Sequence, residues 1–361
     1  MAPPKKSKKV PTGTAIKEGM DSEEHRAHLM KDIMVEAGGA PLATSGLSIH
    51  IPGVIRSGDP WLDMALGRGG WPQSRIVMAS GNEGCGKTTL ALQACAAVQR
   101  AGGIAVYFDS EYKLDLDYAR SLGVDVDSMI LYQAKHIEGM MQTMEKILAL
   151  ARKHREAGNI VPILIVVDSL NATPAKMEVE ADYEDLRPGA QARSWSSGLR
   201  KINALVSQER ATIFLISQVR KDFSVEFGDD ETTGGGKAPR FYAAVIVSLQ
   251  VTAQIKDKDG HRIGNRVFVK VTKNQVAPPF KECHFIVRFG EGTDDIYGLH
   301  EAMKASDMLE TAGSWYTVKD DGTKYQGQPA LRTIIMEEDG ELFTRLEDAL
   351  RIKYNAMDSA A

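Results

Sequence analysis

A glycine-rich segment between an apolar run and a helical pattern limits the folds open to this chain. Residues 81–89 read Gly-Asn-Glu-Gly-Cys-Gly-Lys-Thr-Thr and fit the pattern G-x-x-x-x-G-K-[ST]. The apolar run 76–79 precedes this segment and the helical pattern 90–94 follows it. In the order strand, loop and helix, backbone N–H groups and the helix dipole surround nucleotide phosphates. We therefore expect a nucleoside triphosphate site rather than an ordinary glycine-rich turn.

The residues of this phosphate loop have distinct expected roles. Lys87 places a positive charge on the phosphates, and the hydroxyl of Thr88 can hold Mg²⁺. Cys85 lies where a helix N-terminus can lower a thiol pKa, although a small residue tolerated in the loop is the simpler interpretation. The expected nucleotide contacts are Gly81, Asn82, Glu83, Gly84, Cys85, Gly86, Lys87, Thr88 and Thr89.

The composition is that of a soluble globular protein with more than one domain. Of its 361 residues, 43% are hydrophobic and 25% are charged. The net charge of −4 means that any DNA contact must rest on a local cluster of basic residues. The longest strongly apolar run, 160–167, is too short to cross a membrane, so we expect no membrane partner. Three cysteines without a C-x-x-C pair, and no apolar signal segment, indicate a reducing, cytoplasmic location.

Apolar runs alternate with helical patterns through the middle of the chain. The expected strands are 74–80, 104–109, 129–132, 163–168 and 212–217, and the expected helices are 87–101, 116–122, 137–157 and 191–208. Such alternation predicts an α/β fold with a mostly parallel, twisted sheet and helices on both faces. Two further runs, 245–255 and 266–273, flank a Lys-Asp-Gly-His turn and predict an antiparallel hairpin that extends the sheet.

Composition changes divide the chain into four expected segments. Residues 1–20 read as a basic, poorly ordered tail, and 21–57 as an N-terminal helix followed by an arm. Residues 58–294 read as the nucleotide-binding core. Residues 295–361 read as a small C-terminal α+β domain that ends in a helix.

Polar residues at the ends of three expected strands complete a candidate site. Asp168 closes a buried strand, where a carboxylate can support Mg²⁺ next to the phosphate loop. Glu111 follows the strand after the loop helix. If that strand lies next to the loop strand, Glu111 stands beside the γ-phosphate and can activate water, but a solvated surface glutamate fits the same pattern. Gln218 precedes a long polar loop, so it either reports the γ-phosphate to that loop or is an ordinary strand-end residue.

The long loop at 219–240 is not basic overall. It holds four basic and five acidic residues. The basic residues form two small groups, Arg220-Lys221 and 237–240, adjacent to Phe223 and Phe241. An aromatic side chain at such a place can stack on a base or simply pack within the protein.

The order and spacing of these motifs resemble the RecA family of homologous-recombination ATPases. The similarity runs from Gly58 to Gly292, with a weaker echo at 313–316. Its motifs are Asp-Met-Ala-Leu-Gly at 63–67, the phosphate loop, Phe-Asp-Ser-Glu-Tyr at 108–112, Val-Val-Asp-Ser at 166–169, Ile-Ser-Gln-Val-Arg at 216–220, Lys-Asn at 273–274 and Phe-Gly-Glu-Gly at 289–292. So many motifs in order also separate the chain from helicases and clock ATPases of the same fold.

The resemblance implies a RecA-type core, with ATP and Mg²⁺ as cofactors. Its expected catalytic residues are Glu111, Lys87, Gln218 and Lys273, with Glu111 as the catalytic carboxylate and Gln218 as the γ-phosphate sensor. Asp115 and Tyr118 match the positions that hold and stack the adenine. Lys273 matches a lysine that a neighbouring subunit contributes across the ATP.

The resemblance also implies partners. The chain is expected to assemble with copies of itself into a helical filament, through the segment 21–57 as a polymerisation arm, and to bind single-stranded and double-stranded DNA. Two mobile loops, 178–190 and 219–240, are the expected DNA contacts. Positions expected near DNA are Arg187, Arg193, Arg200, Arg220, Lys221, Phe223, Gly234 and Gly235. Expected interface positions are Arg240, Phe241, Lys273 and Gln275.

By this resemblance the chain is a DNA-dependent ATPase that catalyses homologous pairing and strand exchange in recombinational repair. Two departures indicate a divergent member, viral rather than standard bacterial. Gln275 stands where the family usually has a second lysine across the ATP, and Pro188 stands where bacterial members often have an apolar wedge. These departures slightly favour a first alternative, a regulatory paralogue that binds recombinase filaments with little hydrolysis, whereas the intact Lys87, Glu111 and Asp168 count against it. A second alternative is a hexameric DNA translocase on the same fold.

Overall fold

The structure, a computed structural model, describes residue 30 and residues 51–181, 189–221 and 231–359. Backbone contacts divide the chain into two compact units, 1–49 and 50–361. The expected basic tail lies outside the described residues, as does the expected N-terminal helix apart from residue 30. The strands and helices from β1 onward belong to the second unit.

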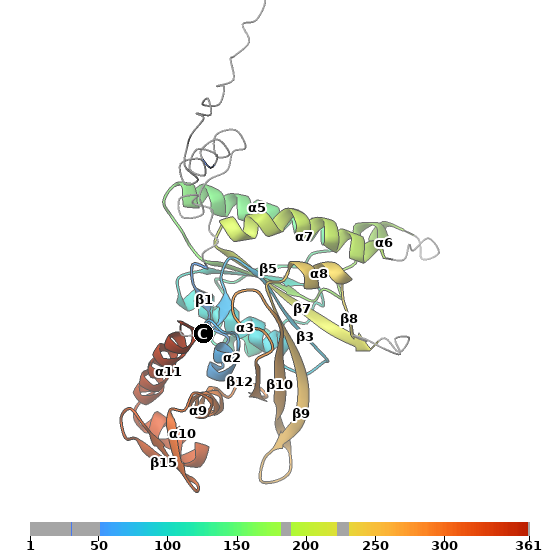
Figure 1. The fold of residues 1–361 in the computed structure, drawn as a ribbon. Coiled ribbons are helices and arrows are strands. Elements are labelled where there is room, and N and C mark those ends of the chain that lie inside the picture. Colours follow the sequence, from blue (N-terminus) through green and yellow to red (C-terminus); the bar gives the residue numbers. More distant parts are fainter. Residues whose placement is uncertain (1–29, 31–50, 182–188, 222–230, 360–361) are drawn as a thin grey trace, which may run out of the picture. The chain divides into compact units, whose positions relative to one another are not determined.

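A ten-stranded sheet forms the centre of this unit (Figure 1). Its strands are β3 (Ile76–Gly81), β4 (Ile104–Asp109), β5 (Ile130–Tyr132), β6 (Ile163–Asp168), β7 (Ala211–Lys221), β8 (Glu231–Thr233), β9 (Val245–Lys256), β10 (Arg262–Asn274), β11 (Glu282–Arg288) and β12 (Gly292–Thr293). Their order is β12, β11, β10, β9, β3, β7, β6, β4 and β5, with β8 paired to β7 off this row. The strands from β9 to β5 are parallel, and β10 to β12 are antiparallel. The predicted mostly parallel sheet with an antiparallel extension is confirmed.

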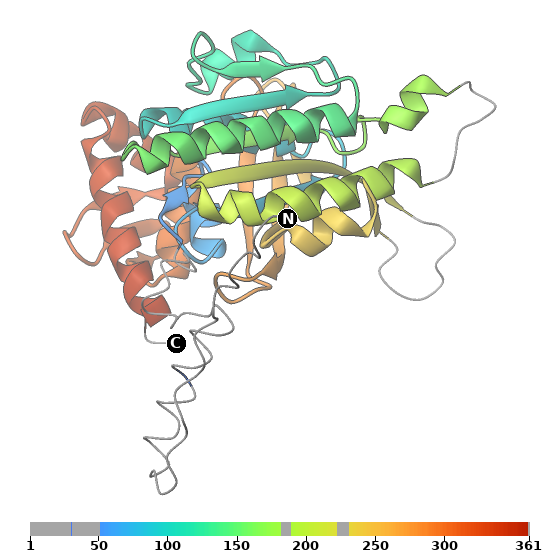
Figure 2. The same cartoon turned by 90° about the horizontal axis from the view of Figure 1, so that it is seen from above.

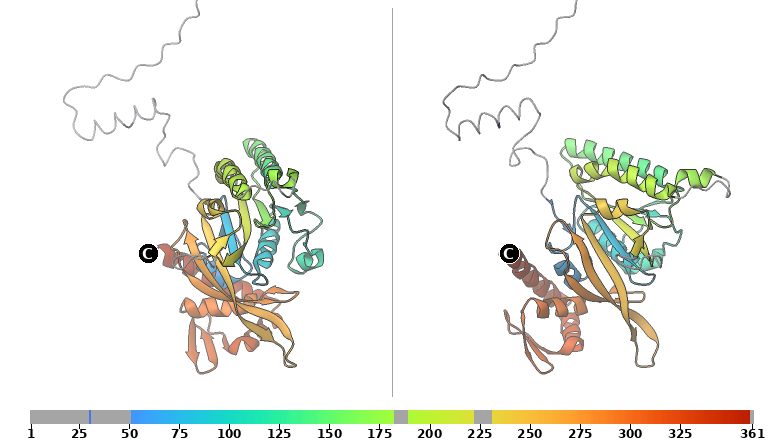
Figure 3. Two further views of the ribbon diagram at one scale, coloured as in Figure 1. Left: turned by 90° about the vertical axis from the view of Figure 1, so that its right-hand side faces the viewer. Right: turned by 45° about the vertical axis from the view of Figure 1, so that its right-hand side comes forward.

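Helices pack on both faces of the sheet. Helix α3 (Lys87–Arg100) packs on one face, and α5 (Ile137–Glu156) and α7 (Ala190–Gln208) lie side by side on the other (Figures 2 and 3). Successive side chains of a strand point to opposite faces, so each central strand serves two cores. Val77 and Ala79 are buried with α3, whereas Ile76 and Met78 are buried with α5 and α7.

The boundaries differ from the predicted ones for local reasons. β3 begins at Ile76 instead of residue 74, because Ser74 has a left-handed backbone with φ of 60°. β7 extends beyond residue 217 to Lys221, because β8 pairs with its end. β11 was not predicted, although the alternately buried Cys283, Phe285 and Val287 mark it as a half-buried strand.

Short elements complete the nucleotide-binding part. They are β1 (Val54–Ile55), α2 (Pro60–Ala65), β2 (Trp71–Pro72), α4 (Leu116–Ser121), α6 (Lys176–Glu180) and α8 (Lys237–Tyr242). Helix α2 starts after Asp59, whose Oδ1 accepts the backbone N–H of Leu62 at 2.9 Å as an N-cap.

The C-terminal part has a core of its own. It contains α9 (Asp295–Ala305), β13 (Leu309–Ala312), β14 (Trp315–Val318), β15 (Lys324–Gln326), α10 (Gly327–Glu337) and α11 (Glu341–Ser359). The three strands form an antiparallel sheet. Trp61 and Met64 of α2 pack against this core, so the C-terminal part is in contact with the nucleotide-binding part. The predicted domain boundary between residues 294 and 295 stays a prediction.

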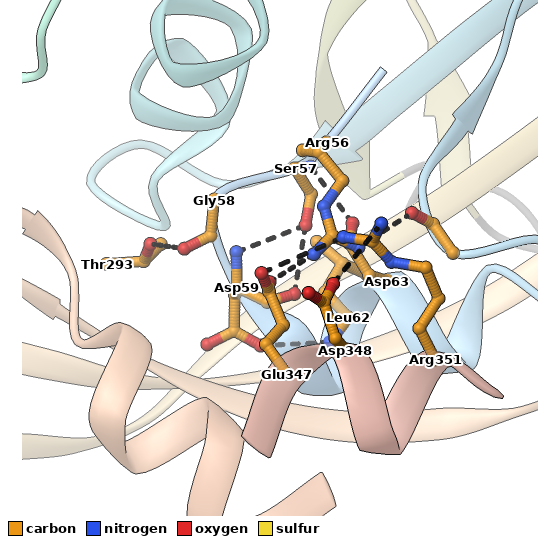
Figure 4. A network of polar contacts seen from close by, with 11 residues as sticks. Arg56, Ser57, Gly58, Asp59, Leu62, Asp63, Thr293, Glu347, Asp348 and Arg351 are labelled. Carbon is orange, nitrogen blue, oxygen red and sulfur yellow. Dashed lines mark hydrogen bonds and ion pairs between the residues drawn. The ribbon is translucent and has the colours of Figure 1, made fainter. Parts of the chain in front are cut away.

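A polar junction joins α2 to α11 (Figure 4). Arg56 forms ion pairs with Asp63, at 3.2 Å between Nη1 and Oδ2, and with Glu347 of α11. The other carboxylate oxygen of Asp63 accepts the backbone N–H of Ser57 at 2.9 Å. Burial raises the pKa of Asp63 to about 6, although Arg56 and Ser57 oppose the shift.

Candidate nucleotide-binding site

The phosphate loop connects β3 to α3, as its sequence predicts. Gly86 is the N-cap of α3 with φ of 88° and ψ of 16°, a left-handed conformation that favours glycine. At Gly81, where φ is 156°, a Cβ atom would meet the carbonyl oxygen of Leu249 in β9. Lys87 is 7% exposed, and its ammonium group donates to the carbonyl oxygens of Gly81 at 2.9 Å and Asn82 at 2.7 Å.

Thr88 and Asp168 form an oxygen pair suited to a magnesium ion. The hydroxyl of Thr88 donates to Oδ2 of Asp168 at 2.9 Å, and the hydroxyl of Tyr107 in β4 donates to the same oxygen at 2.7 Å. Burial raises the pKa of Asp168, and the two hydroxyl donors oppose that shift. Hard cations prefer such hydroxyl and carboxylate oxygens, so these residues fit Mg²⁺.

These groups line a polar cavity of about 250 Å³ at the carboxyl edge of the parallel strands. Its walls come from the phosphate loop and from the ends of β4, β6 and β7. The lining includes Lys87, Thr88, Glu111, Asp168 and Gln218. The structure therefore brings the loop lysine and threonine into one cavity with the three strand-end residues selected from the sequence.

Glu111 reaches the cavity by a different route from the one expected. The expectation that its strand lies next to the loop strand is wrong, because β7 and β6 lie between β3 and β4. The carboxyl ends of parallel strands meet at one edge, which still brings Glu111 into the cavity. Its Oε1 accepts hydrogen bonds from the Ser169 hydroxyl at 2.7 Å and from Nε2 of Gln218 at 3.4 Å.

Gln218 is held from the β6 side by the side-chain amide of Asn171. Asn171 Oδ1 accepts the backbone N–H of Gln218 at 2.9 Å, and its Nδ2 donates to the Gln218 carbonyl oxygen at 3.3 Å. β6 ends at Asp168, so this amide replaces the missing ladder partner. Next to it, the hydroxyl of Ser217 accepts the backbone N–H of Gly234 at 3.1 Å.

The two residues expected at the adenine lie on α4. Asp115 is the N-cap of this helix and accepts the N–H groups of Asp117 and Tyr118. The hydroxyl of Tyr118 shares a 2.8 Å hydrogen bond with the hydroxyl of Thr89, so α4 is tied to the first turn of α3. Asp115, Tyr118 and Thr89 are not among the residues that line the cavity, so their contact with a nucleotide stays a prediction.

Comparison with known proteins finds a family model and relatives that match most of the chain. The RecA N-terminal domain matches residues 42–294. Protein RecA of Corynebacterium diphtheriae is 38% identical over 366 residues, covering 100% of this chain and 94% of that protein. Protein RecA of Clostridioides difficile is 39% identical over 303 residues, covering 84% of this chain and 83% of that protein.

The chain belongs to the RecA family. This membership confirms the expected α/β fold class and the expected function as a recombinase and ATPase of recombinational DNA repair. Among the described helices, none has both the length and the apolar character needed to cross a membrane.

The DNA-contact residues expected from the RecA resemblance are only partly described. Arg187 and Phe223 lie outside the described residues, and Arg220 and Lys221 end β7 with side chains that are not described. Arg193 and Arg200 are exposed on α7, seven residues apart, and so share one face of the helix.

The glycines expected near DNA are closely packed. A Cβ atom on Gly234 would overlap the side-chain amide of Asn171. Gly235 has φ of +78°, and its Cβ would meet Cδ1 of Trp195 at 2.8 Å. These contacts place the end of the second loop against the segment that follows β6 and against α7.

The expected interface residues lie around α8, away from the cavity lining. Nζ of Lys273 donates to the carbonyl oxygens of Arg240 at 3.0 Å and Phe241 at 2.8 Å, and burial lowers its pKa. The backbone N–H of Gln275 donates to the Ala244 carbonyl oxygen at 2.9 Å. Phe241 is 73% exposed, which suits a contact with another molecule.

Sequence reasoning missed three polar residues that support the site: Tyr107, Ser169 and Asn171. Two of them could have been found from their position, because Ser169 and Asn171 follow the end of β6, at the edge of the sheet where the site forms. Tyr107 gave no such signal, since it lies inside an apolar strand. The expectation that a helix N-terminus could lower the thiol pKa of Cys85 is wrong, because burial raises that pKa.

Proposed function

We propose that this chain is a DNA-dependent ATPase that forms filaments on single-stranded DNA and catalyses homologous pairing and strand exchange. One observation carries the proposal. Glu111 and Gln218 touch each other in the cavity that also holds Lys87, Thr88 and Asp168, and Gln218 lies on the strand that leads into the second loop. A residue in this position can respond to the γ-phosphate and transmit its presence to the loop.

ATP is the proposed nucleotide and Mg²⁺ the proposed metal. Mg²⁺ held by Thr88 and Asp168 neutralises charge on the phosphates when it is bound. Lys87 exchanges its two bonds to loop carbonyl oxygens for bonds to phosphate oxygens. Glu111, oriented by Ser169, positions the attacking water and accepts its proton. Asp115 and Tyr118 hold the adenine next to Thr89.

The polar contacts around Gln218 form the proposed switch. Its side chain reaches Glu111, its backbone is fixed by Asn171, and the neighbouring Ser217 holds Gly234 at the far end of the second loop. A shift of Gln218 toward a γ-phosphate therefore acts on both ends of that loop. ATP binding is proposed to order the loop for DNA, and hydrolysis releases the DNA.

Two exposed apolar surfaces support self-association. The edge strand β5 exposes Ile130, Leu131 and Tyr132, each by about two-fifths of its surface, beside an apolar cavity of about 420 Å³. Phe241 on α8 is a second, separate apolar surface. Different surfaces on one chain produce head-to-tail assembly, which gives filaments or rings. We propose the filament, with Lys273 and Gln275 facing the ATP of a neighbour.

The test is the ATPase rate of the purified protein with and without single-stranded DNA, followed by a strand-exchange assay. Stimulation by DNA together with strand exchange is the expected result. DNA binding without hydrolysis or exchange would favour a regulatory paralogue. Rings in electron micrographs, with translocation in place of exchange, would favour a hexameric motor.

A further inference from the structure

We propose that Asn265, oriented by Arg262, is a positioning residue that keeps the phosphate loop in its nucleotide-binding form. The inference rests on the nucleotide site proposed above. Asn265 lies in β10 and is only 1% exposed. Its Nδ2 donates to the carbonyl oxygen of Gly84, in the middle of the loop, at 3.1 Å. A polar side chain buried this completely and aimed at the loop backbone fixes one peptide group of the loop.

The orientation of the Gly84 carbonyl decides which way the next N–H points. In a planar trans peptide the C=O and the following N–H point in opposite directions. A bond from Asn265 to the Gly84 oxygen therefore turns the N–H of Cys85 away from β10. The cavity of the site is lined from the loop and from the β4, β6 and β7 side, whereas β10 and β11 pack behind the loop. Asn265 thus keeps a donor directed toward the phosphates and a repelling carbonyl away from them.

Arg262 determines which end of the Asn265 amide faces the loop. Nε and Nη2 of Arg262 both donate to Oδ1 of Asn265, at 3.1 Å and 2.6 Å. A guanidinium group has only donors, so it selects the amide oxygen and leaves Nδ2 for Gly84. The guanidinium itself lies over the ring of Phe289, 5.6 Å from its centroid. The chain of contacts runs from Phe289 through Arg262 and Asn265 to the loop.

The geometry of the hairpin supports a dedicated contact. β10 has a register shift between Arg262 and Gly264. At Gly264 a Cβ atom would overlap the carbonyl oxygen of Val287 in β11. The glycine allows β10 to approach β11 closely, and Asn265 follows it at the level of the loop. A bulge that re-aims a side chain is a common feature next to functional sites.

The test is Mg-ATP binding to the full chain without DNA, measured by calorimetry, with ATPase kinetics alongside. Asn265→Asp keeps the shape and the attraction to Arg262, but it replaces the donor by an acceptor that repels the Gly84 oxygen. We expect Kd and KM to rise about tenfold while kcat changes less than about twofold. Arg262→Met should raise Kd about threefold, and Arg262→Gln, which keeps an N–H donor, should restore most of the affinity.

Thr252→Val is the matched control, because it removes a donor to the Arg266 carbonyl oxygen in the same hairpin and touches no loop residue. Wild-type Kd in both Asn265→Asp and Arg262→Met, with weak binding in Lys87→Ala, would overturn this inference and leave the proposed function intact. Wild-type binding in Lys87→Ala as well would overturn both. If Asn265→Asp fails to fold, the pair of exposed Arg262 variants decides: equal Kd values for Met, Gln and wild type reject the inference.

Discussion

The nucleotide cavity and the polar junction between α2 and α11 use the same kinds of side chain in opposite ways. In the junction, Arg56 pairs with two carboxylates, those of Asp63 and Glu347 (Figure 4). In the cavity, the carboxylate of Asp168 accepts hydrogen bonds from the hydroxyls of Thr88 and Tyr107, and the ammonium of Lys87 bonds to backbone carbonyl oxygens.

This difference separates charges that hold structure from charges that serve a ligand. A buried carboxylate next to an arginine has its charge balanced within the protein, and removal of either partner leaves the other unbalanced. A carboxylate and a lysine held only by neutral groups can each receive a charged ligand, here a metal ion and phosphate oxygens. We therefore expect substitutions in the cavity to abolish function at little cost in stability. Substitutions in the junction should change stability and leave function intact.

Lys87→Ala tests the cavity with the largest expected effect. The variant should lose ATP hydrolysis completely, because no other described cation lines the phosphate side of the cavity except the exposed Lys113. Its free energy of unfolding should fall by less than about 1 kcal/mol, since the ammonium bonds to two loop carbonyl oxygens, which water can also satisfy, and to the neutral sulfur of Cys85. A coupled ATPase assay and a urea titration measure the two quantities. Full turnover would remove Lys87 from the site.

Glu111→Gln tests whether the charge of this carboxylate is needed for chemistry. The amide keeps the shape and can still accept from Ser169, so ATP and DNA should bind as in the wild type. Turnover should fall on the order of a hundredfold or more, because the amide cannot take a proton from water. Single-turnover hydrolysis and a DNA-binding titration separate the two effects. Unchanged turnover would assign the role of the base to another group.

The two regions also differ in how far the sequence predicts them. The cavity depends on short motifs and on the rule that parallel strands end at one edge, so Lys87, Thr88, Asp168, Glu111 and Gln218 could be selected before the fold was known. The strand order could not be read from the same motifs, and Glu111 was placed beside β3 although two strands intervene. Strand order depends on which long-range pairings are most stable, and no local pattern encodes that choice.

The junction had no local signal at all. Asp63 lies in a family motif, but the other two members of the junction do not reveal themselves: Arg56 lies 7 positions before Asp63 and Glu347 lies 284 positions after it. In the sequence, a buried charged residue is only a polar residue among apolar ones. A helix on the protein surface gives the same pattern. Asn171 is a similar case, because an asparagine after a strand fits an ordinary turn equally well.

Asp63→Asn tests the junction through the pH dependence of stability. Burial raises the pKa of Asp63 to about 6, so the folded protein binds this proton more tightly than the unfolded chain does. Stability linked to the group is therefore greatest at low pH and is lost as pH rises through about 4 to 6. The asparagine does not titrate, so between pH 5 and pH 7.5 the variant should gain about 1–2 kcal/mol relative to the wild type.

Urea unfolding of both proteins at the two pH values measures this gain. Asp348→Asn, at the residue that follows Glu347 in α11, is the control for the loss of one carboxylate, since its side chain is more than half exposed. An equal difference at pH 5 and pH 7.5 for Asp63→Asn would contradict the assignment. ATP hydrolysis by Asp63→Asn should remain within about twofold of the wild type, which is the other half of the comparison.

Asn171→Ala has the smallest expected effect and lies between the two regions in character. Its amide is fixed on both sides like a residue of the junction, yet it contacts Gln218 at the edge of the cavity. Without it, the backbone of Gln218 loses its partner beyond the end of β6, and Gly234 loses the side chain against which it packs. The ATPase rate without DNA should change less than about twofold, whereas its stimulation by single-stranded DNA should fall about fivefold, because one or two hydrogen bonds of about 1 kcal/mol each carry the coupling.

Asn171→Asp is the matched control. It keeps the acceptor for the Gln218 N–H, so its stimulation by DNA should lie between those of Asn171→Ala and the wild type. If DNA stimulation survives in Asn171→Ala, the signal from Gln218 reaches the second loop through Ser217 alone, and Ser217→Ala becomes the variant that must abolish it.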